Sequence, residues 1–217
     1  MTAPVKSRRY DASRRQAQAR ERRARVLDAA WELFQTNGYA ATTVGAVASR
    51  AAVSEETVYK TFGGKSGLVR ELRLRALQGS GTLQAETRSD RLRHHDDPVR
   101  IVRGWARLAA EVAPLVCPVL LLVRDAALAD PGMRALAAEL DDERRVRMAE
   151  NAVVLHRAGH LRRGLGVERA TDILFAASSP EMFELLVLRC GWDLPRYSRH
   201  LEDTLRAALL RPRTSTS

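Results

Sequence analysis

The side chains best placed for chemistry lie in one short polar run, residues 54–61. Val58 and Phe62 are four residues apart and can face a core, which turns the side chains around Val58 outward on a short helix. The outward groups are the hydroxyls, carboxylates and ammonium of Ser54, Glu55, Glu56, Thr57, Tyr59, Lys60 and Thr61. Such groups can donate to phosphates and can read base edges, so the run suits the major groove of DNA.

Two short helices are expected to position these side chains. Val44 and Val47 recur at helical spacing, and a second helical pattern opens at Ser54, whose hydroxyl can accept a hydrogen bond as the N-cap. Only a few residues remain between the two patterns. The spacing therefore predicts a helix-turn-helix, the motif in which the first residues of the second helix reach base edges.

A longer amphipathic helix is predicted before this pair, over about residues 20–36. Val26, Ala30 and Leu33 step round one face of it, and this face can pack on the two short helices. Gly38 follows the helix and can end it as the C′ residue. The three helices together predict a small DNA-binding head.

A further helix is predicted from Lys65, because two glycines break the pattern just before it. The lysine places a cation where a phosphate could also meet helix amides. We therefore expect residues 20–66 to form the DNA-binding domain and residues 67–211 to form a second helical domain, with a tail at residues 212–217.

The net charge is concentrated near the N-terminus. The 217-residue chain carries +10, and residues 1–25 hold nine Lys or Arg against two acidic residues, a share of +7. A basic segment with few apolar residues is expected to be a flexible arm, over residues 1–19, that attracts a polyanion through counterion release. A solvated tail without a partner is the alternative. The position directly before a helix-turn-helix favours an arm that follows DNA.

The run from Val26 to Val69 resembles the DNA-binding domain of TetR-family transcriptional regulators. The signals that carry the resemblance are Gly38-Tyr39, Thr42-Thr43, Val53-Ser54, Thr57-Val58-Tyr59, Phe62 and Lys65-Ser66-Gly67-Leu68, in this order. The resemblance implies an all-α protein, with an N-terminal three-helix helix-turn-helix domain and a C-terminal helical domain for ligand binding and dimerisation.

Function and contacts follow from the resemblance in the same way. It implies a dimeric repressor or activator that binds a palindromic DNA operator and is released by a small-molecule effector. By position, it implies phosphate contacts from Thr43, Thr57, Tyr59 and Lys65. It places Glu55, Glu56 and Lys60 nearest the bases, with Ser54 completing the DNA-binding set.

Three features depart from the usual family pattern. Ala52 stands where the turn usually has glycine, and a left-handed alanine costs about 1 kcal/mol, which predicts a rearranged turn. Thr61 replaces a histidine and is a shorter phosphate donor. Glu55 and Glu56 replace basic or small residues. A carboxylate there can accept from a cytosine amino group or can stabilise the helix dipole, and both interpretations stay open.

Residues 79–98 have little apolar periodicity and are predicted to be the end of one helix and a connection. His94 and His95 within it are possible metal ligands. However, Asp97 before Pro98 is a common start signal for a helix, so we expect a solvated loop and no metal. No cofactor is predicted either.

The second domain is expected to be a helical bundle. A helix over residues 98–112 is predicted to be broken by Pro114 and Pro118, and the apolar segment 115–128 is predicted to be buried. A turn is predicted at residues 130–132. Further helices are predicted over residues 133–157, 167–177, 180–189 and 197–210.

The last two helices are predicted to form a homodimer surface. Leu185 to Leu188 make residues 180–189 apolar on more faces than one core requires, which favours burial against a second subunit. A thick monomeric core is the alternative. DNA recognition also favours a pair, because one short helix reads too few base pairs for useful specificity.

A small-molecule effector is expected between the helices of the second domain, where apolar cavities usually lie. The candidate lining residues are Trp105, Leu121, Met148, His156, Phe175, Met182 and Phe183. Each of them also suits ordinary core packing. Since charges are sparse on these faces, we expect a hydrophobic effector that is uncharged or modestly polar. The alternative is a constitutive DNA-binding protein whose C-terminal domain only dimerises.

Other functional classes lack their signatures. The protein is not expected to be an enzyme, because Gly63-Gly64-Lys65 lacks the rest of a phosphate-binding loop and no nucleophile pairs with a base. Cys117 and Cys190 are isolated and are expected to be buried thiols. No membrane span and no apolar signal segment is expected, which predicts a cytoplasmic protein without a membrane partner.

Overall fold

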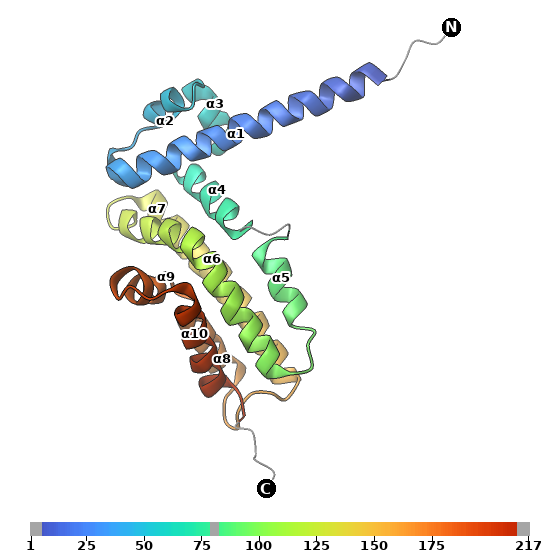
Figure 1. Cartoon of the computed structure of the whole chain (residues 1–217). Helices are drawn as coiled ribbons and strands as arrows, with labels where there is room; N and C mark the ends of the chain where they lie inside the picture. Colours follow the sequence, from blue (N-terminus) through green and yellow to red (C-terminus); the bar gives the residue numbers. More distant parts are fainter. Residues whose placement is uncertain (1–5, 79–82, 212–217) are drawn as a thin grey trace. The chain divides into compact units, whose positions relative to one another are not determined.

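The computed structural model describes residues 6–78 and 83–211, with side chains from residue 14 onward. The predicted tail at 212–217 and the first five residues of the predicted arm lie outside the described residues. The helices are α1 (Lys6–Ala41), α2 (Val44–Arg50), α3 (Glu55–Phe62), α4 (Lys65–Gln78), α5 (Ala85–Leu92), α6 (Pro98–Ala126), α7 (Pro131–Arg157), α8 (Val167–Ala177), α9 (Pro180–Phe183), the π-helix η1 (Glu184–Arg189) and α10 (Leu194–Leu209) (Figure 1). The protein is all-α, as predicted.

The chain forms two compact units, Met1–Leu72 and Arg73–Ser217. The division falls inside α4, a few residues after the predicted boundary at residue 66. In the N-terminal unit, one core joins α1, α2, α3 and the start of α4. Its fully buried side chains include Val26, Ala30, Val47, Val58, Leu68 and Val69.

The first helix starts at Lys6, whereas the sequence predicted a helix from about Arg20 and an irregular arm before it. Alanine, arginine and glutamine favour helices, and a helix already nucleated on the core extends through them at little cost. Gly38 interrupts α1 with φ 77° and ψ 165°, so the main helix does end there as predicted. The buried Thr42 hydroxyl then donates to the Gly38 carbonyl at 2.8 Å.

In the C-terminal unit, α6 runs unbroken through Pro114 and Pro118, which corrects the predicted break. A proline inside a helix costs about 3 kcal/mol. Eleven buried side chains of α6 outweigh this cost, since each fully buried large apolar side chain contributes about 1.5–3 kcal/mol. In the described part of the chain, α6 is the helix long and apolar enough to cross a membrane, but it packs against α5, α7 and α10 as a core helix does.

The segment predicted to be a connection contains α5. Only Ala85 and Ser89 of this helix are buried, so its sequence shows no apolar stripe. The helix is held by polar contacts, including Arg88, whose guanidinium lies 2.5 Å from a carboxylate oxygen of Glu111 on α6. These contacts join residues far apart in sequence, which explains why periodicity missed the helix.

Helix starts in this unit follow the Asp-Pro and Ser-Pro signals. Asp97 accepts from the Val99 amide at 2.9 Å and Ser179 accepts from the Met182 amide at 3.3 Å, as predicted. The predicted turn at residues 130–132 is instead the first turn of α7, because Asp130 caps that helix and Pro131 takes its first position. Proline suits this position, where its missing N–H is not needed.

Candidate nucleic-acid interface

Ser54 sets the start of α3. Its hydroxyl oxygen accepts from the Thr57 amide at 3.2 Å and lies 2.8 Å from the Thr57 hydroxyl. Val58 is fully buried and Phe62 is 9% exposed, so one face of α3 is anchored in the core. The remaining predicted residues face solvent, with Glu55, Glu56, Lys60 and Thr61 exposed, Tyr59 54% exposed and Thr57 half-buried. The predicted polar side chains thus lie on the side of α3 that faces away from the core.

The turn before α3 keeps its shape despite the alanine. Ala52 adopts a left-handed conformation with φ 53°, and it is the non-glycine residue with positive φ in the described chain. The Val53 amide donates to the Ala48 carbonyl at 3.0 Å and the Ala52 amide donates to the Ser49 carbonyl at 3.2 Å. These bonds end α2 as in a glycine-containing turn. The predicted rearrangement is therefore wrong, and the protein bears the strain of about 1 kcal/mol instead.

Thr43 and Lys65 lie at the starts of α2 and α4. The exposed Thr43 hydroxyl accepts from the Ala46 amide at 3.0 Å, which leaves its own hydrogen for an external acceptor. Lys65 is half-buried, and its ammonium donates to the Tyr39 carbonyl at 2.7 Å and lies 4.1 Å from the centre of the Tyr39 ring. Both side chains thus help to hold the starts of their helices in place within the N-terminal unit.

Glu55 and Glu56 differ in their surroundings. A Cβ atom on Gly45 would lie 2.7 Å from Oε1 of Glu55, so this carboxylate rests against the first turn of α2. The amides of a first helical turn carry partial positive charge. This favours the interpretation that the Glu55 carboxylate stabilises a helix dipole. Glu56 is exposed, as Glu55 is, but no contact of its carboxylate with α2 is found among the described residues.

A groove beside α3 was not predicted from the sequence. It has a volume of about 480 Å³ and runs between α1 and α3 in the N-terminal unit. Its lining residues are Gln16, Ala19, Arg20, Arg22, Arg23, Val26, Thr57, Thr61 and Phe62. The signal in the sequence was the basic composition of residues 1–25, but composition could not show which arginines lie next to α3.

The C-terminal unit contains a cavity of about 430 Å³, large enough for a small organic molecule. Trp105 and Met148, two of the predicted lining residues, lie on its wall. The other five do not: Leu121, His156, Phe175, Met182 and Phe183. His156 is exposed, Phe175 lies under the Arg144 guanidinium at 3.7 Å, and Phe183 packs edge-on against Tyr197 at 5.7 Å. Helix rotation, which a sequence does not show, decides which aromatic side chains reach the cavity.

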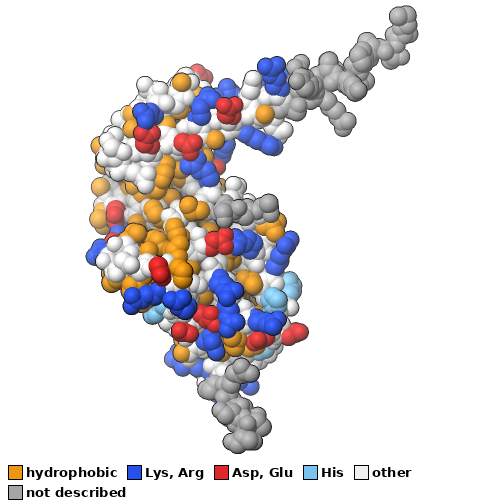
Figure 2. All heavy atoms as spheres, in the orientation of Figure 1, with side chains coloured by type: hydrophobic (Ala, Val, Ile, Leu, Met, Phe, Trp, Pro, Cys, Tyr) orange, Lys and Arg blue, Asp and Glu red, His pale blue; other side chains and the backbone are white. Residues whose placement is uncertain are grey.

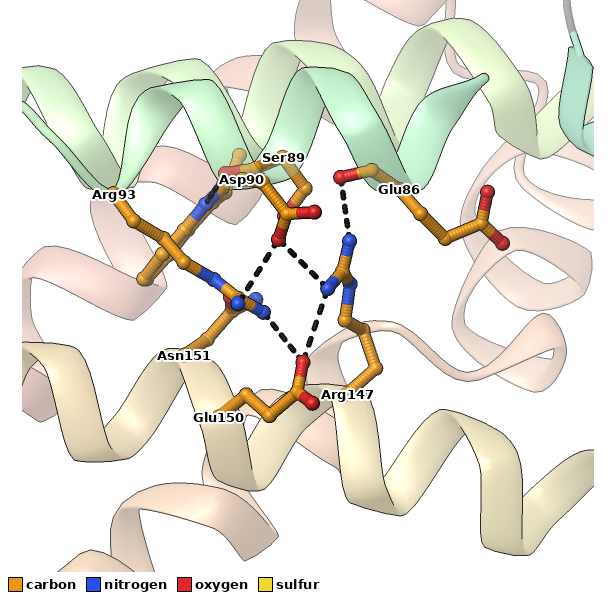
Figure 3. A network of polar contacts seen from close by, with 8 residues as sticks. Glu86, Ser89, Asp90, Arg93, Arg147, Glu150 and Asn151 are labelled. Carbon is orange, nitrogen blue, oxygen red and sulfur yellow. Dashed lines mark hydrogen bonds and ion pairs between the residues drawn. The ribbon is translucent and has the colours of Figure 1, made fainter.

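One side of the cavity carries a polar network between α5 and α7 (Figure 3). Arg147 lies 2.8 Å from Asp90 and 3.0 Å from Glu150, and Arg93 lies 2.9 Å from each of these carboxylates. Hydrogen bonds from Arg93 and Arg147 lower the pKa of Glu150. This network corrects the expectation of sparse charge, although the arginines and acids largely neutralise one another.

Three buried polar side chains on the wall keep unused hydrogen-bonding capacity. Tyr197 is 2% exposed and Ser89 is 8% exposed, and in the described chain no hydrogen bond joins either hydroxyl to another group. Asn151 accepts from Arg93 at 2.8 Å, and its amide N–H groups have no acceptor among the described residues. Burial raises the pKa of both Tyr197 and Cys117, the latter to about 12, so both stay neutral. The cavity therefore suits a mainly apolar, uncharged molecule with a few hydrogen-bonding groups.

Comparison with known proteins agrees with this arrangement. Residues 26–72 match the family described as bacterial regulatory proteins, tetR family. Over 66 residues the chain is 39% identical to the uncharacterized HTH-type transcriptional regulator YvkB of Bacillus subtilis (strain 168), a stretch that covers 30% of this chain and 35% of YvkB. The chain thus matches about a third of the length of that relative.

Solved structures share the fold over nearly the whole chain. NalD of Pseudomonas aeruginosa, the secondary repressor of the MexAB-OprM multidrug efflux pump, is 22% identical with a TM-score of 0.69, over 88% of this chain and 98% of NalD. A SmeT–triclosan complex is 19% identical with a TM-score of 0.67, over 91% and 98% of the two chains. FadR of Bacillus halodurans, a regulator of fatty acid degradation, is 16% identical with a TM-score of 0.66, over 85% and 94%.

A helix-turn-helix head with an outward second helix, joined to an all-helical unit, defines a DNA-binding transcriptional regulator. Residues 26–72 match the DNA-binding domain of the TetR family of such regulators, and the whole chain shares the fold of solved structures described as TetR-family regulators. The proteins that it matches are transcriptional regulators and not enzymes.

Proposed function

We propose that the protein is a repressor that binds a palindromic operator as a homodimer and leaves it when a small molecule enters the cavity of the C-terminal unit. Operator binding is supported by the two faces of α3. One face, with Val58 and Phe62, is buried in the core, and the other is polar and exposed. In this proposal the phosphate contacts come from Thr43, Thr57, Tyr59 and Lys65, the residues nearest the bases are Glu55, Glu56 and Lys60, and Ser54 completes the DNA-binding set.

Exposed apolar side chains near the C-terminus support dimerisation. Leu185 and Leu188 on η1 are 50% and 57% exposed, and Leu194 at the start of α10 is 38% exposed. Large exposed apolar side chains gathered on neighbouring elements favour burial against another subunit, and a two-fold pair makes such a patch self-complementary. Two α3 helices could then read half-sites about 34–36 Å apart, or a multiple of one helical turn.

The cavity supports release by an effector. Its mixture of apolar wall and unbonded Tyr197, Ser89 and Asn151 groups suits an uncharged hydrophobic molecule with hydrogen-bonding groups. SmeT, the repressor of the Stenotrophomonas maltophilia multidrug efflux pump SmeDEF, has been solved with triclosan, and the similar fold here favours a related arrangement. Such a regulator would act in the cytoplasm, where its operator lies.

Operator selection followed by effector titration tests this proposal. The full-length protein should enrich a palindrome from random or genomic DNA, and its complex should weaken as salt rises. Triclosan and similar uncharged aromatic molecules should then dissociate the complex. The cavity-filling variant Ala109→Phe should bind the operator but lose the response. A selected operator that no molecule dissociates would point to a constitutive DNA-binding protein, and failure to enrich any palindrome would overturn the proposal.

A further inference from the structure

The basic side of α1 lies beside the helix proposed to read DNA. The blue side chains along the described part of α1 in Figure 2 are arginines, with some acidic side chains among them, and three arginines line the groove between α1 and α3. The α3 side of the groove contributes Thr57 and Thr61. Among the residues that the structure describes, no acidic side chain lines the groove.

Two neighbouring arginines of α1 have structural roles. Arg23 lies 2.6 Å from Glu71 on α4, and its guanidinium stacks 4.8 Å from the centre of the Phe62 ring. Arg25 pairs with Glu21 at 3.7 Å. Arg23 therefore fixes α1 against α3 and α4, which gives the groove a defined shape.

Arg20 and Arg22 have no such role. Both are exposed, and no ion pair or hydrogen bond joins either guanidinium to another residue in the described chain. At 100° per residue, Arg20 and Arg22 fall on opposite sides of the face formed by Gln16, Ala19 and Arg23. Two free guanidinium groups thus border a groove whose lining also includes apolar side chains and, from α3, two threonine hydroxyls.

We propose that this groove binds the phosphate backbone of DNA next to the half-site read by α3, with Arg20 and Arg22 as the charged donors. Guanidinium groups bind phosphate oxygens in bidentate geometry, and the threonine hydroxyls can add neutral hydrogen bonds. The proposal rests on operator binding by α3. It adds a contact outside the recognition helix, and one that fixes position without reading sequence.

The helical state of this segment affects the energetics. The backbone of α1 continues from Arg22 to Lys6, a length of about 24 Å at 1.5 Å per residue. Residues already in a helix lose less conformational entropy on binding than a flexible arm would lose. The contact is therefore expected to strengthen binding to any operator that has duplex on both sides of the half-sites.

Fluorescence anisotropy with the full-length protein and the selected operator tests the groove. The variant Arg20→Ala/Arg22→Ala should reduce the slope of log affinity against log salt by about 0.9 for each phosphate that is no longer neutralised. A dimer loses two arginines from each subunit, so its slope should fall by about 3.6. The weakening should be uniform across operator sequences. Arg20→Lys/Arg22→Lys keeps the charge and should retain most of the slope.

A matched control and a change in the DNA complete the design. Arg163→Ala/Arg169→Ala removes the same charge from exposed positions in the C-terminal unit and should leave the slope unchanged. Cutting the duplex back to the half-site edges should weaken binding by the wild-type protein but not by the double alanine variant.

The outcomes separate this inference from the proposed function. If the selection enriches no operator, the proposed function itself is overturned. An operator bound with the same salt slope by wild type and double alanine variant, or a wild-type affinity independent of the flanking duplex, overturns the groove contact alone. The dependence of wild-type affinity on the flanking duplex needs no variant. It therefore tests the groove contact even if the arginine substitutions disturb folding.

Discussion

The ammonium of Lys65 lies 2.7 Å from the Tyr39 carbonyl oxygen and 4.1 Å from the centre of the Tyr39 ring, and this pairing joins the start of α4 to the end of α1. Lys65 was predicted from family resemblance to contact DNA phosphate. The structure gives it an additional role within the N-terminal unit. Removing it should therefore affect folding as well as DNA binding.

Lys65→Met should lower the free energy of unfolding by about 1–2 kcal/mol, because it removes a charge-assisted hydrogen bond and a cation–π interaction at a half-buried position. Urea denaturation followed by circular dichroism measures this change. Lys60→Met serves as the control, since Lys60 is exposed, and should leave stability within about 0.5 kcal/mol. Equal stability of the two variants would show that the interaction with Tyr39 contributes nothing.

Ala52→Gly should stabilise the protein by about 0.5–1 kcal/mol, because glycine adopts the left-handed conformation of this turn without steric strain. The midpoint of denaturant unfolding measures the change. Ala46→Gly makes the same chemical change at an exposed position inside α2 and should destabilise by about 0.5–1 kcal/mol. A loss of stability in Ala52→Gly would contradict the strain at this turn.

Glu55→Ala should cost stability and leave operator preference largely unchanged, since the Glu55 carboxylate rests on the first turn of α2. Glu56→Ala should fold normally and relax preference at one base pair, with a loss in discrimination of about 1–3 kcal/mol. Operator selection with each variant compares the two carboxylates. The roles are reversed if Glu55→Ala alone loses base preference.

Leu185→Glu/Leu188→Glu should produce a folded monomer with much weaker operator binding. Two carboxylates buried in an apolar interface are strongly unfavourable, whereas on an exposed monomer surface they cost little. Sedimentation at micromolar concentration measures the assembly. Leu128→Glu changes an 84% exposed leucine elsewhere and should keep the wild-type assembly. A wild-type protein that sediments as a monomer would contradict the proposed interface.

Stability should fall at high pH because of Cys117. Burial raises the pKa of this thiol to about 12 from an ordinary value of 9. A raised pKa means that the folded state favours the neutral thiol. The stabilising contribution of the neutral thiol is therefore complete below pH 9 and is lost as pH rises toward 12. Cys117→Ala should reduce this loss in denaturant titrations between these pH values. Burial also raises the pKa of Tyr197, so ionisation of its hydroxyl at high pH should lower stability as well.

The two cysteines show where sequence reasoning was limited. Both were expected to be buried, and Cys117 is, but Cys190 is exposed just after η1. Isolated cysteines are usually buried, and nothing in the local sequence distinguishes the two. Exposure at Cys190 depends on how η1 and α10 pack, which is set by residues far away in the chain.

The amino-acid sequence by itself determined the helix-turn-helix, because its signals are local. The Ser54 cap, the spacing of Val58 and Phe62 and the proline starts of later helices act through interactions within one or two turns. Tertiary structure decided the rest. The unbroken α6, the polar α5, the choice of cavity-lining side chains and the groove at Arg20 and Arg22 depend on packing between distant segments. Packing energies summed over such segments exceed local preferences of about 1–3 kcal/mol, so sequence pattern alone does not reveal them.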